Sequence, residues 1–279
     1  MSAEDFRLFR DFIQSRSGIF FSDNSKPILE KRIARLVRAC KLRSYRDYYY
    51  FLRYDRRKEE ELEAVIDSVT TNETYFFREE RQLKAFKEEI LPELHAAKLS
   101  RGDRTLRIWS AGCSSGEEPY TLAMLIFDSK LFQDWNVDIF ASDINRRVLQ
   151  IARKGVYGKS SFRVTEKADR DRYFKEVDGR WRINDEMKKQ VNFSFLNLID
   201  RSKISLLRTM DLIFCRNVII YFDLPTKKTI IQSLEGKLIP GGYLLLGHSE
   251  SLISITQAFE LKHLKNDLVY QKPAKRKIF

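Results

Sequence analysis

Short apolar runs alternate with amphipathic segments after about residue 100, and this alternation constrains the fold more than any other feature of the chain. It predicts an α/β domain in which helices cover a mostly parallel sheet. We expect strands at 106–109, 137–141, 191–196, 211–215 and 243–247, and helices at 117–131, 146–153 and 224–238. The last part, 259–271, has the pattern of a closing antiparallel hairpin.

The segment 156–190 interrupts this alternation. Two strand-like stretches, 173–177 and 180–183, flank the dipeptide Asp178-Gly179, which is typical of a tight hairpin turn. We therefore expect a small antiparallel β-subdomain at about 156–190, inserted into a larger domain that spans 101–279.

Residues 1–70 read as helical throughout and predict a separate all-helical domain, which a linker helix at 71–100 joins to the α/β domain. In the helix at 28–40 the apolar side chains share one face. The opposite face carries the basic residues Lys31, Arg32, Arg35 and Arg38.

Positive charge is concentrated in the helical domain. Residues 26–58 contain twelve Lys or Arg residues against three acidic ones, in a chain whose net charge is +12. Such an excess predicts an acidic partner, which could be a nucleic acid, a membrane surface or a protein. The alternative is an ordinary solvated face on a helix that packs against the core.

The rare residue types exclude several classes of protein. Three widely spaced cysteines without a C-x-x-C pair indicate neither a disulfide framework nor a zinc site, and three histidines without an H-E-x-x-H motif make metal catalysis unexpected. No apolar run approaches the roughly 20 residues that a membrane span requires. The first residues lack the apolar core of a secretory signal, so we expect a cytoplasmic protein.

The loop after the first predicted strand, 110–116, marks the expected ligand site, because ligands of open parallel sheets bind beyond the carboxyl ends of the strands. Gly112 and Gly116 would let a ligand approach the backbone closely. Asp143 ends the second strand, where an acidic residue binds ribose hydroxyls in nucleotide-binding folds. The arrangement predicts a cofactor with a nucleoside part.

The acids that follow the loop narrow the choice of cofactor. Glu117 and Glu118 would repel a pyrophosphate, and the loop lacks both G-x-G-x-x-G and the P-loop lysine. S-adenosylmethionine carries a nucleoside and a cationic sulfonium but no phosphate, and it fits better than NAD or ATP.

The same loop also matches G-x-S-x-G, the nucleophile elbow of α/β hydrolases, with Ser114 as the nucleophile. Asp211 and His248 follow in the order of a hydrolase triad. Against this reading, the chain before the loop is helical where a hydrolase has strands, and it has no HGGG-type oxyanion segment.

Six sequence blocks, in order along nearly the whole chain, resemble the CheR-type chemoreceptor glutamate methyltransferases. The blocks are TNETYFFRE at 71–79, GEEPY at 116–120, ASDIN at 141–145, FLNL at 195–198, FCRNVIIYF at 214–222 and GHSES at 247–251. The resemblance implies an all-helical N-terminal domain, a linker, and a Rossmann-like S-adenosylmethionine-dependent methyltransferase domain with an inserted β-subdomain.

The resemblance also implies roles for individual residues. The residues that match the family's cofactor contacts are Asn72, Thr74, Arg78, Glu117, Asp143, Asn197, Leu198, Arg216 and Asn217. In the acidic pair, the first glutamate is the family's contact, so Glu117 is expected to face the cofactor in place of Glu118. Arg78 could also orient the incoming carboxylate during catalysis.

The implied reaction transfers a methyl group to glutamate side chains of chemotaxis receptors, giving glutamyl methyl esters and S-adenosylhomocysteine without a metal. The acidic methylation helices of the receptor should dock on Lys31, Arg35 and Arg38. Some family members bind a receptor's C-terminal pentapeptide through a glycine-containing loop in the β-subdomain. The tight hairpin at 176–181 predicts weak or absent binding of this tether.

We further expect a monomer that binds no nucleic acid and meets the membrane only through its receptor. Two alternatives remain open. A pI near 9.5 is compatible with a nucleic-acid methyltransferase, although 216–219 lacks the prolines of a motif that holds a flipped base. A non-catalytic adaptor that binds the cofactor is the other.

Overall fold

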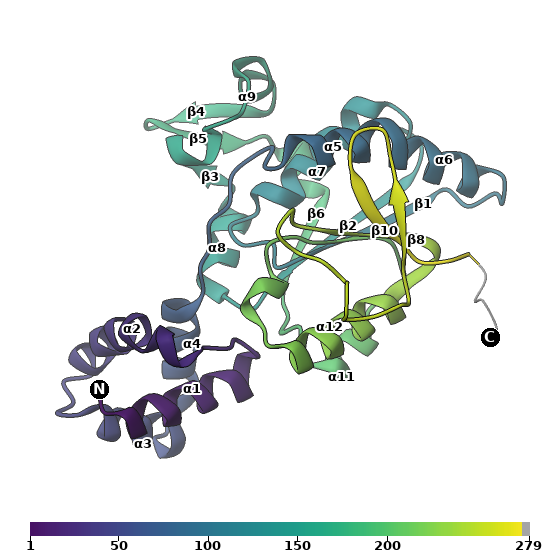
Figure 1. Ribbon diagram of the computed structural model, residues 1–279. Coiled ribbons are helices and arrows are strands. Elements are labelled where there is room, and N and C mark those ends of the chain that lie inside the picture. Colours follow the sequence, from purple (N-terminus) through teal and green to yellow (C-terminus); the bar gives the residue numbers. More distant parts are fainter. Residues whose placement is uncertain (275–279) are drawn as a thin grey trace.

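The computed structural model describes residues 1–274 and has a seven-stranded sheet at its centre (Figure 1). The strand order is β6-β2-β1-β7-β8-β10-β9, and the first five of these strands pair in parallel. The bounds are β1 Thr105–Ala111, β2 Asn136–Asp143, β6 Val191–Phe195, β7 Met210–Cys215, β8 Leu238–Leu246, β9 Glu260–His263 and β10 Leu268–Gln271. The predicted parallel sheet and closing hairpin are both confirmed.

The chain reverses its direction of winding at the central strand β1. It runs outward first through β2 and β6, then returns to the other side of β1 and continues through β7 and β8. A crevice forms at the carboxyl ends of strands where such a reversal occurs. The topology therefore places a ligand site beside the loop that follows β1.

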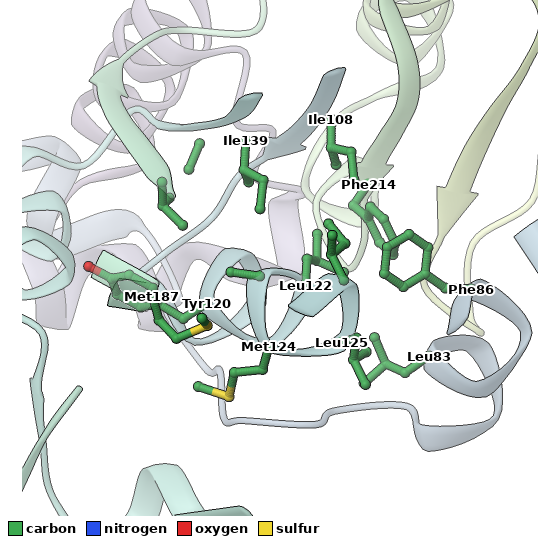
Figure 2. Packing of buried hydrophobic residues seen from close by; sticks show 14 of the residues in the cluster. Leu83, Phe86, Ile108, Tyr120, Leu122, Met124, Leu125, Ile139, Met187 and Phe214 are labelled. Atoms are coloured by element: carbon green, nitrogen blue, oxygen red, sulfur yellow. The ribbon is translucent and has the colours of Figure 1, made fainter. Parts of the chain in front are cut away.

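Helices cover both faces of the sheet, and alternate residues of each strand point to opposite layers. On one face, Ile108, Ile139 and Phe214 pack against α7 (Glu117–Ser129) and the helices before β1, as Figure 2 shows for Leu83, Phe86, Leu122 and Leu125 among others. On the other face, Trp109, Ile213 and Leu244 pack with α11 (Arg201–Ser205) and α12 (Leu224–Lys237). Burial on two sides explains why residues in the middle of the central strands, 108–109 in β1, 139–141 in β2 and 212–215 in β7, are apolar.

The first 70 residues form a helical domain, as predicted. Its helices are α1 Ala3–Ser17, α2 Lys26–Ala39, α3 Tyr45–Tyr54 and α4 Lys58–Val69, with a short 3-10 turn, η1, at Asp23–Ser25. Leu29, Ile33 and Val37 of α2 are buried, but Ile28, expected on the same face, is 55% exposed. The apolar stripe is thus narrower than the sequence indicated.

The prediction of a linker helix at 71–100 is only partly correct. Helix begins at residue 80, with α5 (Glu80–Ala85), the π-helical η2 (Phe86–Ile90) and α6 (Leu91–Leu99), whereas 70–77 has no regular structure. Phe77 and Glu79 adopt positive φ angles of 60° and 61°, which an α-helix does not allow. The residues expected to contact the cofactor therefore lie on an extended segment.

The insertion forms the predicted small antiparallel sheet, with the order β3-β5-β4 (Figure 1). Its elements are β3 Val156–Tyr157, η3 Lys159–Phe162, α9 Lys167–Tyr173, β4 Phe174–Val177, β5 Arg180–Ile183 and α10 Asp185–Lys189. The hairpin turns on Asp178 and Gly179, whose φ angles are 51° and 69°. Positive φ at both positions is the geometry of a two-residue turn, so no longer loop is present between β4 and β5.

Candidate functional site

A cavity of about 260 Å³ opens at the carboxyl ends of β1, β2, β6 and β7. Segments from the whole chain line it. They are Ser17 and Ile19, 69–75, Arg78, Leu83, 112–114, Glu118, Thr121, 143–144, 196–198, 216–218 and 220–222. Most of the residues singled out from the sequence meet here, as the strand topology requires.

Asp143 stands at the end of β2 and lines the cavity while it is only 8% exposed. Its Oδ2 accepts the Ser114 backbone N–H at 2.8 Å, and its Oδ1 accepts that of Asn145 at 2.8 Å. Burial raises the pKa of this carboxyl, and the two backbone donors oppose that rise. The loop after β1 is thereby fixed to the end of β2, with a carboxylate at the point where a ribose would bind.

Protein packing requires both glycines of the loop, and only Gly112 lies where a ligand in the cavity could approach it. A Cβ on Gly112, whose φ is 84°, would lie 2.4 Å from Val218 Cγ2. A Cβ on Gly116, with φ 96°, would lie 2.9 Å from the Cβ of Ala152. Gly112 still lines the cavity, but Gly116 does not.

The extended segment after α4 covers one side of the cavity and supplies Asn72, Thr74 and Arg78. Asn72 Nδ2 donates to Thr70 Oγ1 at 3.3 Å, and Asn145 Nδ2 donates to the same oxygen at 2.8 Å. The Asn72 carbonyl accepts Ser114 Oγ at 3.4 Å. Hydrogen bonds therefore hold this segment to the loops after β1 and β2.

Arg216, at the end of β7, is buried among acceptors, and its side chain is 2% exposed. Its Nη2 lies 3.2 Å from Glu79 Oε2 and donates to the Arg78 carbonyl at 2.6 Å, and its Nη1 is 3.6 Å from Glu118 Oε2. Burial raises the pKa of Glu118, and the nearby Arg216 charge opposes that rise. The positive charge of Arg216 is thus balanced by Glu79 and Glu118 of the protein itself.

Glu118 lines the cavity and Glu117 does not, which differs from the expectation that Glu117 faces the cofactor. Glu117 accepts hydrogen bonds from Ser115 Oγ at 2.7 Å and Ser161 Oγ at 2.9 Å, on the side of the β-subdomain. Burial raises its pKa as well. Neighbouring residues of a helix point about 100° apart, so only one of the two can face the cavity.

Glu250 was not predicted, although it organises the loop after β7. Its carboxylate accepts backbone N–H groups of Gly247 at 2.7 Å, Asn217 at 2.7 Å, Val218 at 2.9 Å and Ile220 at 3.2 Å. Asn217 has a φ of 58°, in the left-handed region that Asn adopts more readily than most residues, and the Glu250 carboxylate holds the loop in this conformation. Asn217 Nδ2 also donates to Glu79 Oε1 at 3.4 Å.

The N-terminal domain contributes to the cavity directly, which the sequence did not indicate. Ser17 and Ile19, at the end of α1, line the cavity beside Asn197 and Leu198. Asn197 Nδ2 donates to the Arg16 carbonyl at 2.8 Å, and Ile19 forms an isolated antiparallel bridge with Phe222. The cavity is therefore complete only when both domains are present.

The hydrolase interpretation is excluded by geometry. Asp211 lies near the start of β7, away from the cavity, where it accepts Lys98 Nζ at 2.7 Å and the Arg107 backbone N–H at 2.8 Å. The side chain of His248 is 51% exposed, and its Nε2 lies 3.3 Å from Asp267 Oδ2. Neither residue contacts Ser114, so no triad forms.

Lys31, Arg35 and Arg38 lie on the exposed face of α2, on consecutive turns. None of the three forms an ion pair within residues 1–274. In contrast, Arg32 on the same helix points inward and donates to the Val69 carbonyl and to Thr71. The three exposed cations are free to meet an acidic partner.

Within residues 1–274, no group of three or more His, Cys, Asp or Glu side chains could hold a metal ion. No helix in that range has the length and apolar character needed to cross a membrane.

A parallel sheet that reverses at β1, an acidic residue at the end of its second strand and a cavity lined by carboxylates define the α/β class of methyltransferases that bind a nucleoside cofactor. The chain belongs to the CheR methyltransferase family. The model of the family's all-alpha domain matches residues 4–70, and that of its SAM binding domain matches residues 72–267. The fold, the family and S-adenosylmethionine as cofactor, all predicted from the sequence, are confirmed.

Curated relatives match along nearly their whole length. The chain is 37% identical to chemotaxis protein methyltransferase 2 of Vibrio cholerae, covering 98% of this chain and 94% of the relative. It is 36% identical to the chemotaxis protein methyltransferase of Vibrio parahaemolyticus, covering 97% and 98%. It is 34% identical to chemotaxis protein methyltransferase 1 of Pseudomonas aeruginosa, covering 96% and 97%. The protein is thus an S-adenosylmethionine-dependent methyltransferase of chemotaxis.

Proposed function

We propose that the enzyme methylates glutamate side chains in the acidic helices of chemotaxis receptors, releasing S-adenosylhomocysteine. The observation that carries this proposal is the cavity beyond β1 and β2, whose described lining has three carboxylates, Glu73, Glu118 and Asp143, and one arginine, Arg78, that forms no ion pair. Among the described residues that line it, Arg78 and Arg216 are the cationic side chains, and Arg216 is neutralised by Glu79 and Glu118. Such a lining suits a cationic nucleoside cofactor and an anionic substrate.

The residues present fit S-adenosylmethionine. Asp143 would accept the ribose hydroxyls, and Leu198 and Val218 offer apolar surface to the base. Glu118 would accept a hydrogen bond from the ammonium group of the methionine part, since its carboxylate lines the cavity. We infer that Asn72, Thr74, Asn197, Arg216 and Asn217 complete the cofactor site, either by contact or by holding the loops that do. Glu117 would act only through Ser115 and Ser161.

S-adenosylmethionine supplies an electrophilic methyl group when bound. A glutamate has a pKa of about 4.3 and is ionised at neutral pH, so the protein needs no general base. Its task is to align the carboxylate with the methyl group and to exclude water, and orientation of this kind can supply several kcal/mol of the barrier.

Arg78 is the candidate for aligning the carboxylate. Its Nη1 donates to the Glu73 carbonyl at 2.7 Å, and its guanidinium lies 5.7 Å from the centre of the Tyr75 ring. It forms no ion pair with any described carboxylate. A guanidinium held by a carbonyl and an aromatic ring still has N–H donors available for an incoming carboxylate.

The receptor helices would approach over the helical domain. Lys31, Arg35 and Arg38 are exposed and form no ion pairs in the described part of the chain, so they can steer an acidic helix toward the cavity. We also propose that the enzyme acts in the cytoplasm as a monomer, that it binds no nucleic acid and that it meets the membrane only through the receptor.

Transfer of radiolabelled methyl groups to receptor-containing membranes tests the proposal. We expect label on the receptor that is released as methanol by mild base, because carboxyl esters hydrolyse and methylated amides or nucleobases do not. Parallel reactions with RNA and DNA test the nucleic-acid alternative. Cofactor binding without transfer to any of these substrates would favour the non-catalytic adaptor.

A further inference from the structure

The inserted β-subdomain contacts the segment that covers the cavity. The Phe76 ring packs against Tyr157, Phe162 and Phe174 of the insertion, with ring centres 4.8, 5.1 and 4.9 Å apart. The Phe76 backbone N–H donates to the Ser161 carbonyl at 2.9 Å. Phe76 is fully buried, so the insertion anchors the middle of an otherwise irregular segment.

One side chain of the insertion reaches past this anchor to the cavity lining. Arg163 Nη2 lies 2.7 Å from Glu73 Oε1, and its guanidinium lies 3.7 Å from the centre of the Tyr75 ring. Glu73 and Tyr75 both line the cavity. They are also the two residues that Arg78 contacts, through the Glu73 carbonyl and the Tyr75 ring.

We propose that Arg163 is a positioning residue for methyl transfer: it fixes Glu73 and Tyr75 so that Arg78 faces the substrate carboxylate. This role rests on the proposed function. Residues 71–77 lie outside every helix and strand, and contacts with other elements must supply their order. Arg163 contacts both residues that hold the Arg78 side chain, Glu73 and Tyr75, and it does so from the inserted β-subdomain.

The chain offers a matched control in Arg172. Arg172 lies in the same insertion, pairs with Asp128 at 2.7 Å and stands 5.1 Å from the Tyr173 ring. Its side chain is 54% exposed, against 45% for Arg163. The cavity lining does not include it. Loss of either arginine therefore removes an ion pair and a ring contact. Only Arg163 makes these contacts with residues that line the cavity.

The test compares turnover at saturating cofactor and receptor. We expect Arg163→Ala to lower kcat about tenfold, since small displacements of an orienting group are costly, while Arg172→Ala leaves kcat within about twofold. Arg163→Lys keeps the charge but not the planar contact with Tyr75, and it should restore part of the turnover. Binding of S-adenosylhomocysteine should change far less than kcat.

A double-mutant cycle shows whether Arg163 acts through Arg78. In an Arg78→Ala background, Arg163→Ala should lower kcat no further, whereas a merely structural loss would lower it again. Equal kcat for Arg163→Ala and Arg172→Ala, or additive losses in the cycle, would overturn the role of Arg163. Absence of transfer by the wild-type enzyme would overturn the proposed function and this role with it.

Discussion

The carboxyl edge of the sheet and the exposed face of α2 both carry charged residues, but the two regions hold them in opposite ways. At the sheet edge, Asp143 and Arg216 are buried, and each forms hydrogen bonds within the protein. Asp143 accepts backbone N–H groups, whereas Arg216 donates to the Arg78 carbonyl and to Glu79. On α2, Lys31, Arg35 and Arg38 are exposed and form no ion pair within residues 1–274.

This difference indicates two modes of recognition in one enzyme. A buried, hydrogen-bonded carboxylate has one orientation and strengthens electrostatic contacts in a site of low dielectric constant. Exposed cations on flexible side chains act at a distance, speed up association and are screened by salt. The sheet edge should therefore determine which cofactor binds, and α2 should determine how readily an acidic receptor helix arrives.

The sharpest test of the sheet edge is Asp143→Asn. The Asn side chain has one acceptor oxygen, so it cannot accept hydrogen bonds from the Ser114 and Asn145 backbones on two separate oxygens and from a ribose as well. We therefore expect affinity for S-adenosylhomocysteine to fall about 100-fold, as for loss of a charged hydrogen-bond acceptor. Isothermal calorimetry measures this loss. Asp138→Asn, near the start of β2, is the control, since the Asp138 carboxylate accepts a hydrogen bond from Asn192 at 3.2 Å and does not line the cavity. Equal affinities for the two variants would contradict the assignment.

Arg78 lines the cofactor cavity and is also the residue proposed to orient the receptor carboxylate. We expect Arg78→Ala to lower kcat about 30-fold at saturating cofactor, because the carboxylate loses its orienting partner. Transfer of labelled methyl to receptor, with cofactor varied, separates this effect from a loss of cofactor affinity. Weaker cofactor binding with unchanged turnover at saturation would show that Arg78 serves the cofactor alone.

Sequence reasoning predicted the parts of the site that follow from element order. Asp143 was found because a strand pattern ends there, and parallel strands place their carboxyl ends together. Glu117 and Glu118 are adjacent in one helical turn, so their pattern leaves open which of them faces the cavity. The resemblance favoured the first, and the cavity lining contains the second.

The contributions of Glu250, Ser17 and Ile19 could not be predicted in the same way. Glu250 acts by accepting backbone N–H groups from a loop 30 to 33 residues earlier, and backbone donors leave no trace in the side-chain sequence. Ser17 and Ile19 reach the cavity through the packing of two domains. Helical periodicity identifies buried faces, but it does not say which domain surface they meet.

Charge reversal tests the α2 face. Changing Lys31, Arg35 and Arg38 together to Glu should raise KM for receptor about tenfold at low salt, and less at high salt, while cofactor affinity stays unchanged. Methylation rates over a series of salt concentrations measure this. The control reverses Arg101, Arg104 and Lys130. These exposed cations lie just before β1 and just after α7, away from the cavity. Equal losses in both triples would indicate a general effect of net charge.

Cofactor binding at the sheet edge should also depend on pH. Burial raises the pKa of Glu118 and of Asp143, so both gain protons at a higher pH than ordinary carboxyls. Because the cofactor needs the ionised forms, affinity should be complete above these raised pKa values and should decline as pH falls through them. We expect a loss of roughly threefold between neutral and mildly acidic pH. Glu118→Gln should flatten this profile.

The smallest effect is expected at the β-subdomain hairpin. Asp178 and Gly179 close β4 and β5 in a two-residue turn, so this edge has no loop that could wrap around a receptor's C-terminal pentapeptide. Calorimetry with such a peptide should show no measurable heat, and deleting the tail from a receptor should leave its methylation rate unchanged. Binding that Arg180→Glu or Arg182→Glu abolishes would contradict this prediction. It would also mean that this enzyme recognises its receptor by charge at two separate surfaces, α2 and β5.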